Sequence, residues 1–403
     1  MSLEPTTNFK DSNGVDLGTK LVTKDYLISV YPSIGEQIGI PPELWVWGNG
    51  GQGRLGTNNQ SNISTPVTTF SGGSNWRTFS AGFGSTYAIK TDGSLWVWGN
   101  ANNGQLGNGL TTGSILTPIT TFAGENNWKQ VVSKGINTLA IKINGTLWTW
   151  GSNSAGRLGI NSTGSRSTPV TTFAGGTNWK QVSPGRSHNA AIKTDGTLWT
   201  WGAGSYGRLG NNNTVNVSTP VTTFAGGTNW KQVSSGGYHT AAIKTDGTLW
   251  VTGRAARYLG TNDTTPDRLT PVTTFAGGTN WKQVTGGDTL LAAIKTDGTL
   301  WTWGAGYGLG NNLSPSAVLT PITTFSGGTN WKQVKITNDT IAAIKTDGTL
   351  WTWGDGNGGT LGNFSTTARS TPVTTFAGGN NWKQVDVGYG AFTHMAAIRS
   401  VDF

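Results

Sequence analysis

The sequence contains no cysteine, only three histidines and little charge, since charged residues make up 12% of its 403 residues. Without cysteine, the fold cannot use disulfides or thiolate-bound metals, and composition gives no indication of the redox compartment. No stretch approaches the ~18 consecutive apolar residues of a membrane-spanning helix, so we expect no membrane span. The first thirty residues also lack the apolar core of a cleavable signal peptide, so none is expected.

Glycine and tryptophan, by contrast, are abundant, with 62 and 20 residues respectively. Many glycines with little charge are typical of a chain of short strands joined by tight turns, which favours an all-β fold. Disordered chains are poor in aromatic residues, so twenty tryptophans predict a folded protein with a substantial core.

A segment of the form Leu-Trp-x-Trp-Gly recurs seven times, at intervals of 50 to 52 residues. The fifth copy departs from it, because Thr252 replaces the second tryptophan. Three other blocks recur once per interval, as at residues 168–173, 178–182 and 190–196. A fixed period of this length indicates a repeat architecture. The seven copies begin at Leu44, Leu95, Leu147, Leu198, Leu249, Leu300 and Leu350.

Each block predicts a short strand. Ile-Lys-Thr-Asp-Gly-Thr-Leu-Trp predicts a β-hairpin with a primed turn at Asp-Gly. The Thr-Pro pair places a strand at a sheet edge, where a missing N–H costs little. Four strands per repeat make a sheet too small to stand alone, so neighbouring repeats must stack and bury both faces. The sequence therefore predicts a seven-bladed β-propeller.

The ends of the repeat region predict how the ring closes. The first Leu-Trp-Val-Trp, residues 44–47, lacks an upstream partner strand, and residues 396–399 lack a downstream one. Pairing these segments completes one blade from both ends of the chain and removes an open sheet edge. We therefore predict an all-β propeller over residues 44–403, preceded by a leader over residues 1–43.

Residues 94–107 resemble the signature of RCC1-type (regulator of chromosome condensation) repeats, as do residues 44–56 and 198–210. The family's second mark is a glycine followed closely by histidine, and it occurs three times, at Gly185 with His188, Gly236 with His239, and Gly390 with His394. Four copies depart from this mark and carry Ser85, Asn137, Leu290 and Thr340. The resemblance covers residues 44–400 and implies a propeller that acts through protein surfaces, with no cofactor bound by the repeat.

The leader lies outside the repeat, and its residues 10–32 are similar to leaders of structural proteins of marine tailed phages, cyanophages especially. This resemblance implies a docking arm in a virion, with other virion proteins or a host-surface protein as partners. The alternative is a leader that covers one end of the propeller. The predicted interface residues on the arm are Asp16, Leu17, Lys20, Leu21, Lys24, Tyr26 and Tyr31.

The net charge of +9 invites a nucleic-acid interpretation. Twelve of the seventeen lysines, however, occupy two fixed repeat positions. We interpret the charge as a small bias multiplied around the ring and predict no specific nucleic-acid binding. Arg254, Arg257 and Tyr258 of the fifth copy form the best candidate interface patch, because Arg and Tyr are common interface anchors. The alternative is sequence drift in a solvated loop.

Catalysis finds little support in the residue pattern. His188, His239 and His394 share one repeat position, so a ring would hold them far apart as structural histidines. The recurring aspartates belong to hairpin turns. No carboxylate pair suited to glycoside hydrolysis is evident, and the Gly-rich runs lack the Lys-Ser/Thr of a phosphate loop. We predict that the chain is not an enzyme and uses neither cofactor nor metal.

The leading hypothesis is therefore a non-enzymatic virion structural protein. The alternative is a bacterial binding module or enzyme inhibitor, secreted or on the cell surface, that acts through the loops of the propeller. A carbohydrate-binding lectin is a third reading. Its weakness is that the tryptophans are needed between the blades.

Overall fold

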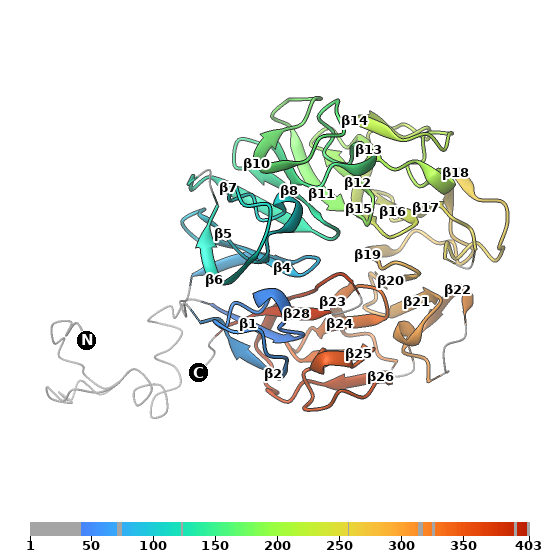
Figure 1. Cartoon of the computed structure of the whole chain (residues 1–403). Coiled ribbons are helices and arrows are strands. Elements are labelled where there is room, and N and C mark those ends of the chain that lie inside the picture. Colours follow the sequence, from blue (N-terminus) through green and yellow to red (C-terminus); the bar gives the residue numbers. More distant parts are fainter. Residues whose placement is uncertain are drawn as a thin grey trace, which may run out of the picture. The chain divides into compact units, whose positions relative to one another are not determined.

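Seven four-stranded antiparallel sheets stand around a central axis in the computed structural model, each forming one blade of a propeller (Figure 1). The structure describes residues 42–70, 75–121, 124–256, 258–312, 317–324, 327–390 and 393–400, which belong to the compact unit Pro42–Ser400. The predicted all-β, seven-bladed architecture is confirmed.

The four strands of a blade run outward from the axis in chain order. The innermost strands are β3 (Trp76–Ala81), β7 (Trp128–Ser133), β11 (Trp179–Pro184), β15 (Trp230–Ser235), β19 (Trp281–Gly286), β23 (Trp331–Ile336) and β27 (Trp382–Val387). The second strands are β4 (Ser85–Lys90), β8 (Asn137–Lys142), β12 (His188–Lys193), β16 (His239–Lys244), β20 (Leu290–Lys295), β24 (Thr340–Lys345) and β28 (His394–Arg399).

The outer half of each blade comes from the Leu-Trp-x-Trp-Gly and Thr-Pro blocks. The third strands are β5 (Leu95–Asn100), β9 (Leu147–Gly151), β13 (Leu198–Gly202), β17 (Leu249–Gly253), β21 (Leu300–Gly304), β25 (Leu350–Gly354) and β1 (Glu43–Gly48). The fourth are β6 (Ser114–Thr120), β10 (Arg166–Thr171), β14 (Val217–Thr222), β18 (Arg268–Thr273), β22 (Val318–Thr323), β26 (Arg369–Thr374) and β2 (Ile63–Thr68). The prolines thus lie in edge strands, as predicted.

One blade is composite and closes the ring. Its order is β2-β1-β28-β27, so strands from the two ends of the repeat region lie side by side. β1 pairs antiparallel with β28 along its whole length, from Glu43 opposite Arg399 to Gly48 opposite His394. The predicted pairing of residues 44–47 with residues 396–399 is confirmed. It gives the composite blade four paired strands, like every other blade.

The hairpin turns differ from the prediction. The Gly196 N–H bonds to the carbonyl of Lys193, and the Lys193 N–H bonds to the carbonyl of Thr197, so the loop has three residues, 194–196, instead of two. The central residues of this turn have no positive φ, which a primed turn would need, and Gly196 follows them with a φ of 79°. Asp195 instead accepts hydrogen bonds from the N–H and hydroxyl of Thr197, which stabilises this wider turn.

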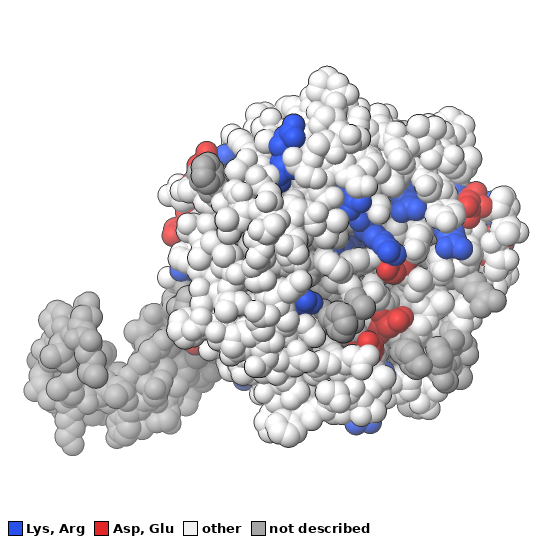
Figure 2. All heavy atoms as spheres, in the orientation of Figure 1, with Lys and Arg blue, Asp and Glu red and all other residues white. Residues whose placement is uncertain are grey.

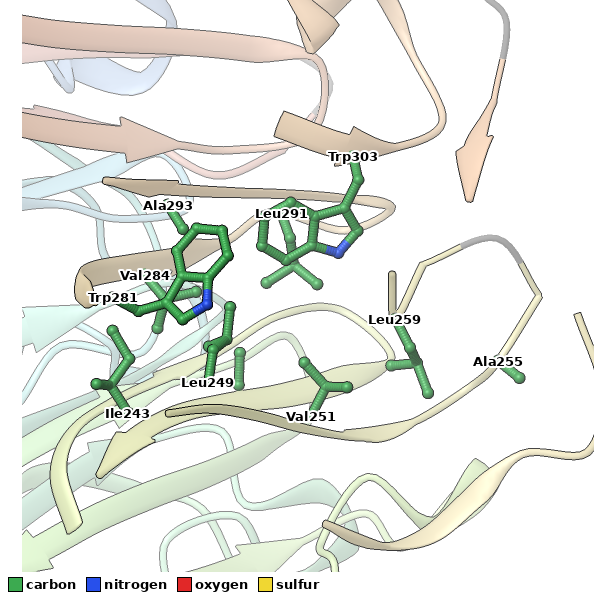
Figure 3. Packing of buried hydrophobic residues seen from close by; sticks show 11 residues of the cluster. Ile243, Leu249, Val251, Ala255, Leu259, Trp281, Val284, Leu291, Ala293 and Trp303 are labelled. Carbon is green, nitrogen blue, oxygen red and sulfur yellow. The ribbon is translucent and has the colours of Figure 1, made fainter. Parts of the chain in front are cut away.

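The hydrophobic core lies between blades. In the cluster of Figure 3, Ile243, Leu249 and Val251 of one blade pack against Trp281 and Trp303 of the next. In most blades, the tryptophan that starts the innermost strand contacts both tryptophans of the third strand, edge-on or at a tilt. Trp281, for example, contacts Trp301 and Trp303 at distances between ring centroids of 6.0 and 6.3 Å. A single blade therefore has no core of its own.

In five blades the second tryptophan of the third strand also forms a polar link, whereas the Trp303 indole N–H has no partner among the described residues. Trp201 is fully buried, and its indole N–H donates to the carbonyl of Arg157 in the preceding blade, at 2.9 Å. Trp47, Trp98, Trp150 and Trp353 make the equivalent bond across their own blade interfaces. The indole approaches Gly159 so closely that a Cβ there would lie 2.9 Å from its nitrogen, which explains the glycine of the repeat.

At the fifth copy the interface is different, because Thr252 stands in place of this tryptophan. Its hydroxyl lies 3.0 Å from the Gly207 carbonyl and 2.6 Å from the Arg268 carbonyl. The adjacent cavity, lined by Leu198, Trp230 and Pro271 among others, has a volume of about 10 Å³. The neighbouring blades have thus closed around the smaller side chain.

The innermost strand of each sheet faces the channel, and glutamine side chains of neighbouring blades form hydrogen bonds with backbone groups of these strands. Gln232 donates its amide N–H to the carbonyl of Val284 and accepts the N–H of the same residue, each at 2.9 Å. Gln181 and Gln283 make the same pair of bonds to the innermost strand of the following blade. These glutamines tie the blades together around the axis and satisfy backbone groups that would otherwise lack partners.

Truncation tests the ring closure. We expect that a chain lacking residues 1–41 keeps the unfolding temperature of the full propeller, because β1 begins at Glu43. A chain lacking residues 1–48 loses β1 and exposes the edges of β28 and β2, so we expect unfolding or aggregation. Thermal unfolding followed by circular dichroism distinguishes the two. Equal stability of both truncated chains would contradict the closure.

Substitution of one tryptophan tests the interface. We expect Trp201→Thr to destabilise the propeller by about 3–5 kcal/mol, because a fully buried indole and its hydrogen bond are lost. Trp199→Thr is the matched control, since Trp199 is only partly buried and should cost clearly less. Urea unfolding monitored by tryptophan fluorescence measures both. A larger loss for Trp199→Thr would refute this account.

Candidate functional site on the loop face

Each blade directs two of its connections to the same end of its sheet: the loop between its first and second strands, and the longer one between its third and fourth strands. We call this side of the propeller the loop face. The opposite side, which carries the hairpins between second and third strands and the links between blades, is the hairpin face. The sequences of the seven repeats differ much more on the loop face than on the hairpin face.

The loops between first and second strands surround the channel mouth, and they vary in every copy. The strands repeat closely at their opposite ends, as Trp-Lys-Gln-Val and Ala-Ile-Lys in most blades, so the scaffold holds seven different short loops in one ring. The last loop is also three residues longer than that between β11 and β12. The residues at the centre of these loops are Phe83, Gly135, Arg186, Gly237, Asp288, Asn338 and Tyr389.

A cavity of about 490 Å³ opens at this channel mouth. Phe83 and Tyr389 form an aromatic wall, with ring centroids 6.5 Å apart. Arg186 and Asp288 supply opposite charges, with guanidinium and carboxylate 3.8 Å apart. A mostly apolar wall with a few convergent polar groups is typical of a binding site.

The channel is crossed below the mouth by Lys134. Its ammonium group donates hydrogen bonds to the carbonyls of Ser235, at 2.9 Å, and Gly286, which end the innermost strands of two other blades. Burial lowers the pKa of Lys134 to about 8, although the carboxylates of Asp288 and Asp386 oppose this shift. Lys134 also lines a second cavity, of about 60 Å³, farther along the channel.

Beside the mouth lies a cluster of alternating tyrosine and arginine side chains, which we call the arginine–tyrosine cluster. The rings of Tyr238 and Tyr258 stack at 6.3 Å, and Tyr206 meets Tyr238 edge-on at 5.9 Å. The Arg254 guanidinium lies 4.9 to 5.8 Å from all three ring centroids. The cluster comprises Arg186, Arg208, Arg254, Tyr206, Tyr238 and Tyr258.

The members of this cluster differ in exposure. Arg186 has half of its side chain exposed and donates to the hydroxyl of Tyr238 at 3.1 Å. Arg208 is buried. It donates to the carbonyls of Ser205 and Gly237, so it joins loops of two blades. Arg208 therefore supports the surface from below, while Arg186 remains accessible to a partner.

The arginine–tyrosine cluster meets carboxylates at the channel mouth, where the Arg186 guanidinium lies 3.8 Å from Asp288. Asp288 accepts a hydrogen bond from the hydroxyl of Tyr389. Burial, with Asp355 and Asp288 nearby, raises the pKa of Asp339 above its ordinary value. In Figure 2, blue and red side chains gather toward the centre and right of the face shown, while the rest of it is mostly uncharged.

Two of the residues predicted from the sequence as an interface patch, Arg254 and Tyr258, lie together in the arginine–tyrosine cluster. Arg257 lies outside the described residues, as do Asp16, Leu17, Lys20, Leu21, Lys24, Tyr26 and Tyr31 of the leader. Sequence reasoning missed Arg186, Tyr206 and Tyr238. Their signal was present as departures from the repeat in the loops before the second and fourth strands.

The histidines are buried between blades. His188 donates through Nε2 to the Thr240 hydroxyl at 2.8 Å, since that hydroxyl donates onward to the backbone carbonyl of Arg208. Burial lowers the pKa of His239 to about 3, and neither of its ring nitrogens has a hydrogen-bond partner among the described residues. The reason is a substitution in the next blade, where Leu291 occupies the position that Thr240 has opposite His188.

Comparison with known families agrees with this geometry. A family model described as the RCC1-like domain matches residues 43–397. The chain belongs to the RCC1-like domain family. This membership confirms the resemblance of the repeats, whereas the phage resemblance of the leader gains no support from it.

Two plant proteins illustrate how this RCC1-like domain relates to characterised sequences. It is 30% identical over 267 residues to the ultraviolet-B receptor UVR8 of Arabidopsis thaliana, covering 64% of this chain and 60% of that protein. It is 26% identical to the mitochondrial RCC1 domain-containing protein RUG3 of the same plant, covering 66% and 62%. The chain thus spans somewhat less than two thirds of these relatives.

Solved structures show the same fold at low identity. The human protein WBSCR16 superimposes with a TM-score of 0.77 at 20% identity, covering 89% of this chain and 99% of that one. Prp20p of Saccharomyces cerevisiae gives a TM-score of 0.76 at 18% identity, covering 89% and 92%. The seven-bladed arrangement therefore recurs in proteins of widely different sequence.

In the part of the chain that the structure describes, no three histidine or carboxylate side chains come together as a possible metal site. Within the same residues, no helix has the length and apolar character needed to cross a membrane.

Acid should destabilise the propeller as the pH falls from about 6.5 toward about 3. His239 stays neutral in the folded state to about pH 3, whereas the unfolded chain takes up the proton near 6.5, so stability present above pH 6.5 is lost on acidification. We expect His239→Leu, which copies Leu290, to reduce the drop in urea midpoint between pH 7 and pH 4.

His188→Leu is the control for this prediction. It removes a histidine that has a hydrogen-bond partner, so we expect the free energy of unfolding to fall by about 1 kcal/mol already at pH 7. An unchanged pH dependence in His239→Leu would show that His239 is not one of the groups responsible.

Proposed function

We propose that this chain is a non-enzymatic protein-binding module whose loop face is the binding surface. The observation that carries the proposal is the contrast between nearly identical blades and a ring of loops that differ in every copy. These loops place Tyr206, Tyr238 and Arg254 beside an open cavity. Tyrosine and arginine are the residues most often found as energetic anchors of protein interfaces.

Several features support a binding role over a catalytic one. Burial lowers the pKa of His188 and His394 well below the ordinary value, so both stay neutral and lie away from solvent. Burial and the Asp288 carboxylate raise the pKa of Tyr389 above its ordinary range, so it serves as a hydrogen-bond donor to Asp288. These groups hold the loops in place and are poorly suited to proton transfer.

The surface also indicates what a partner must present. Arg186 and Arg254 favour carboxylates or aromatic rings, and Asp288, 3.8 Å from Arg186, favours a basic group. The cavity of about 490 Å³ accommodates a protruding loop or side chain. A related fold is known with proteins bound, since yeast Prp20 was crystallised with Kap60.

This proposal corresponds to the binding-module alternative of the sequence analysis. The virion hypothesis rested on the leader, most of which lies outside the described residues. Location in a virion, on a cell surface or outside the cell stays a prediction, as does the docking role of residues 1–43.

Affinity capture with paired variants tests the loop face. We expect a partner retained by the wild-type chain to bind Tyr238→Ala and Arg254→Ala at least tenfold more weakly, because each removes an anchor of the arginine–tyrosine cluster. Lys231→Ala on the hairpin face should leave the dissociation constant unchanged. Calorimetry on the purified pair measures the affinities.

Unchanged thermal unfolding of each variant shows that its effect is local. A partner that loses affinity for Lys231→Ala while it binds both loop-face variants normally would overturn the proposal. Binding that depends only on residues 1–41 would instead support the docking-arm hypothesis.

A further inference from the structure

The hairpin face carries a ring of exposed cations around the channel. The residue after the first tryptophan of each innermost strand lies in a β-bulge, where the pairing register shifts, as at Lys180 between Trp179 and Gln181. The bulge repeats in every blade, so seven cationic side chains are exposed at equivalent places. They are Arg77, Lys129, Lys180, Lys231, Lys282, Lys332 and Lys383.

A second ring of cations comes from the last residue of each second strand. Lys193 illustrates it, with its ammonium group 4.3 Å above the ring of Trp199 and 4.7 Å from that of Trp179. These contacts cover the partly buried tryptophans, so they are not open platforms for a sugar ring. The ring comprises Lys90, Lys142, Lys193, Lys244, Lys295, Lys345 and Arg399.

Carboxylates on the same face are fewer, and most are engaged locally. Fourteen cations face seven carboxylates among the described residues. Asp195 and its equivalents accept two hydrogen bonds from the residue two positions later, which lowers their pKa and holds them in the hairpin turns. The seven carboxylates are Glu43, Asp92, Glu125, Asp195, Asp246, Asp297 and Asp347.

Exposed phenylalanines follow the fourth strand in five of the blades, at the outer rim where the link to the next blade begins, and the Phe224 N–H bonds there to the carbonyl of Gly210. Phe224 belongs to the turn Thr223–Gly226, closed by a hydrogen bond from the Gly226 N–H to the Thr223 carbonyl. It exposes 66% of its surface, and its described equivalents expose 63 to 70%. These equivalents are Phe70, Phe173, Phe275 and Phe376.

We propose that the hairpin face docks onto an anionic lipid bilayer. Cations attract anionic headgroups, and exposed aromatic side chains insert at the boundary between headgroups and acyl chains. The arrangement favours a bilayer over a nucleic acid. Mobile lipids can gather under every cation of a closed ring, whereas the fixed phosphates of a duplex form a linear track that meets only part of one.

Vesicle co-sedimentation of the full chain tests this docking. We expect strong binding to phosphatidylcholine vesicles containing a quarter phosphatidylserine, and at least tenfold weaker binding to phosphatidylcholine alone. High salt should release the protein, because it screens exposed charges. The triple variant Lys180→Ala, Lys231→Ala and Lys282→Ala should bind on the order of 100-fold more weakly, since each cation contributes about fivefold.

The phenylalanines need a separate variant with a matched control. Phe224→Ser combined with Phe275→Ser should weaken vesicle binding most at high salt, where the apolar contribution remains. Val215→Ser is the control, because Val215 is 67% exposed but lies in the β13–β14 connection on the loop face. Arg186→Ala and Arg254→Ala control for charge and should not change vesicle binding, which separates this proposal from that of the loop face.

Two outcomes would overturn the docking proposal. One is equal binding to neutral and anionic vesicles, or binding to neither at physiological salt. The other is tighter binding to a 20-base-pair DNA duplex than to anionic vesicles at the same salt, with no effect of the phenylalanine variants. Thermal unfolding of every variant confirms that the propeller is intact.

Discussion

Burial of tryptophan between adjacent blades is the interaction on which the rest of this structure depends. A four-stranded sheet of this size has no interior, so each blade gains one only from its neighbour. The indole of Trp201 shows what the neighbour must supply: an apolar wall, a carbonyl acceptor and a glycine that permits close approach. These requirements recur at most interfaces, which is why the tryptophan and glycine positions of the repeat vary little and why the ring must close.

The same constraint divides the molecule into two chemically different faces. Positions fixed by packing leave the adjoining residues of the hairpin face nearly uniform, so two basic residues per repeat become two rings of cations. The loops around the channel mouth are outside this constraint, because the glutamines and tryptophans already hold the blades together. They are free to differ, and a recognition surface without repetition becomes possible on a repetitive scaffold.

Departures from the repeat concentrate near the arginine–tyrosine cluster. Thr252 replaces an interface tryptophan in the blade that carries Tyr238 and Arg254, and Leu291 deprives His239 of its partner in the next interface. Each change gives up an interaction that other interfaces keep. Lost interactions beside variable loops fit a region shaped by recognition more than by stability.

The sequence by itself determined the number of blades and the composite blade, because period and strand pattern are local properties, whereas an interface role for Arg254 and Tyr258 stays a prediction. It did not determine the hairpin turn, where the Asp195 side chain stabilised a wider form than the Asp-Gly pair suggested. Only the tertiary structure brought Tyr206, Tyr238 and Arg186 together from three loops. It also placed the repeated lysines on one side, because the direction of each strand decides which face its ends reach.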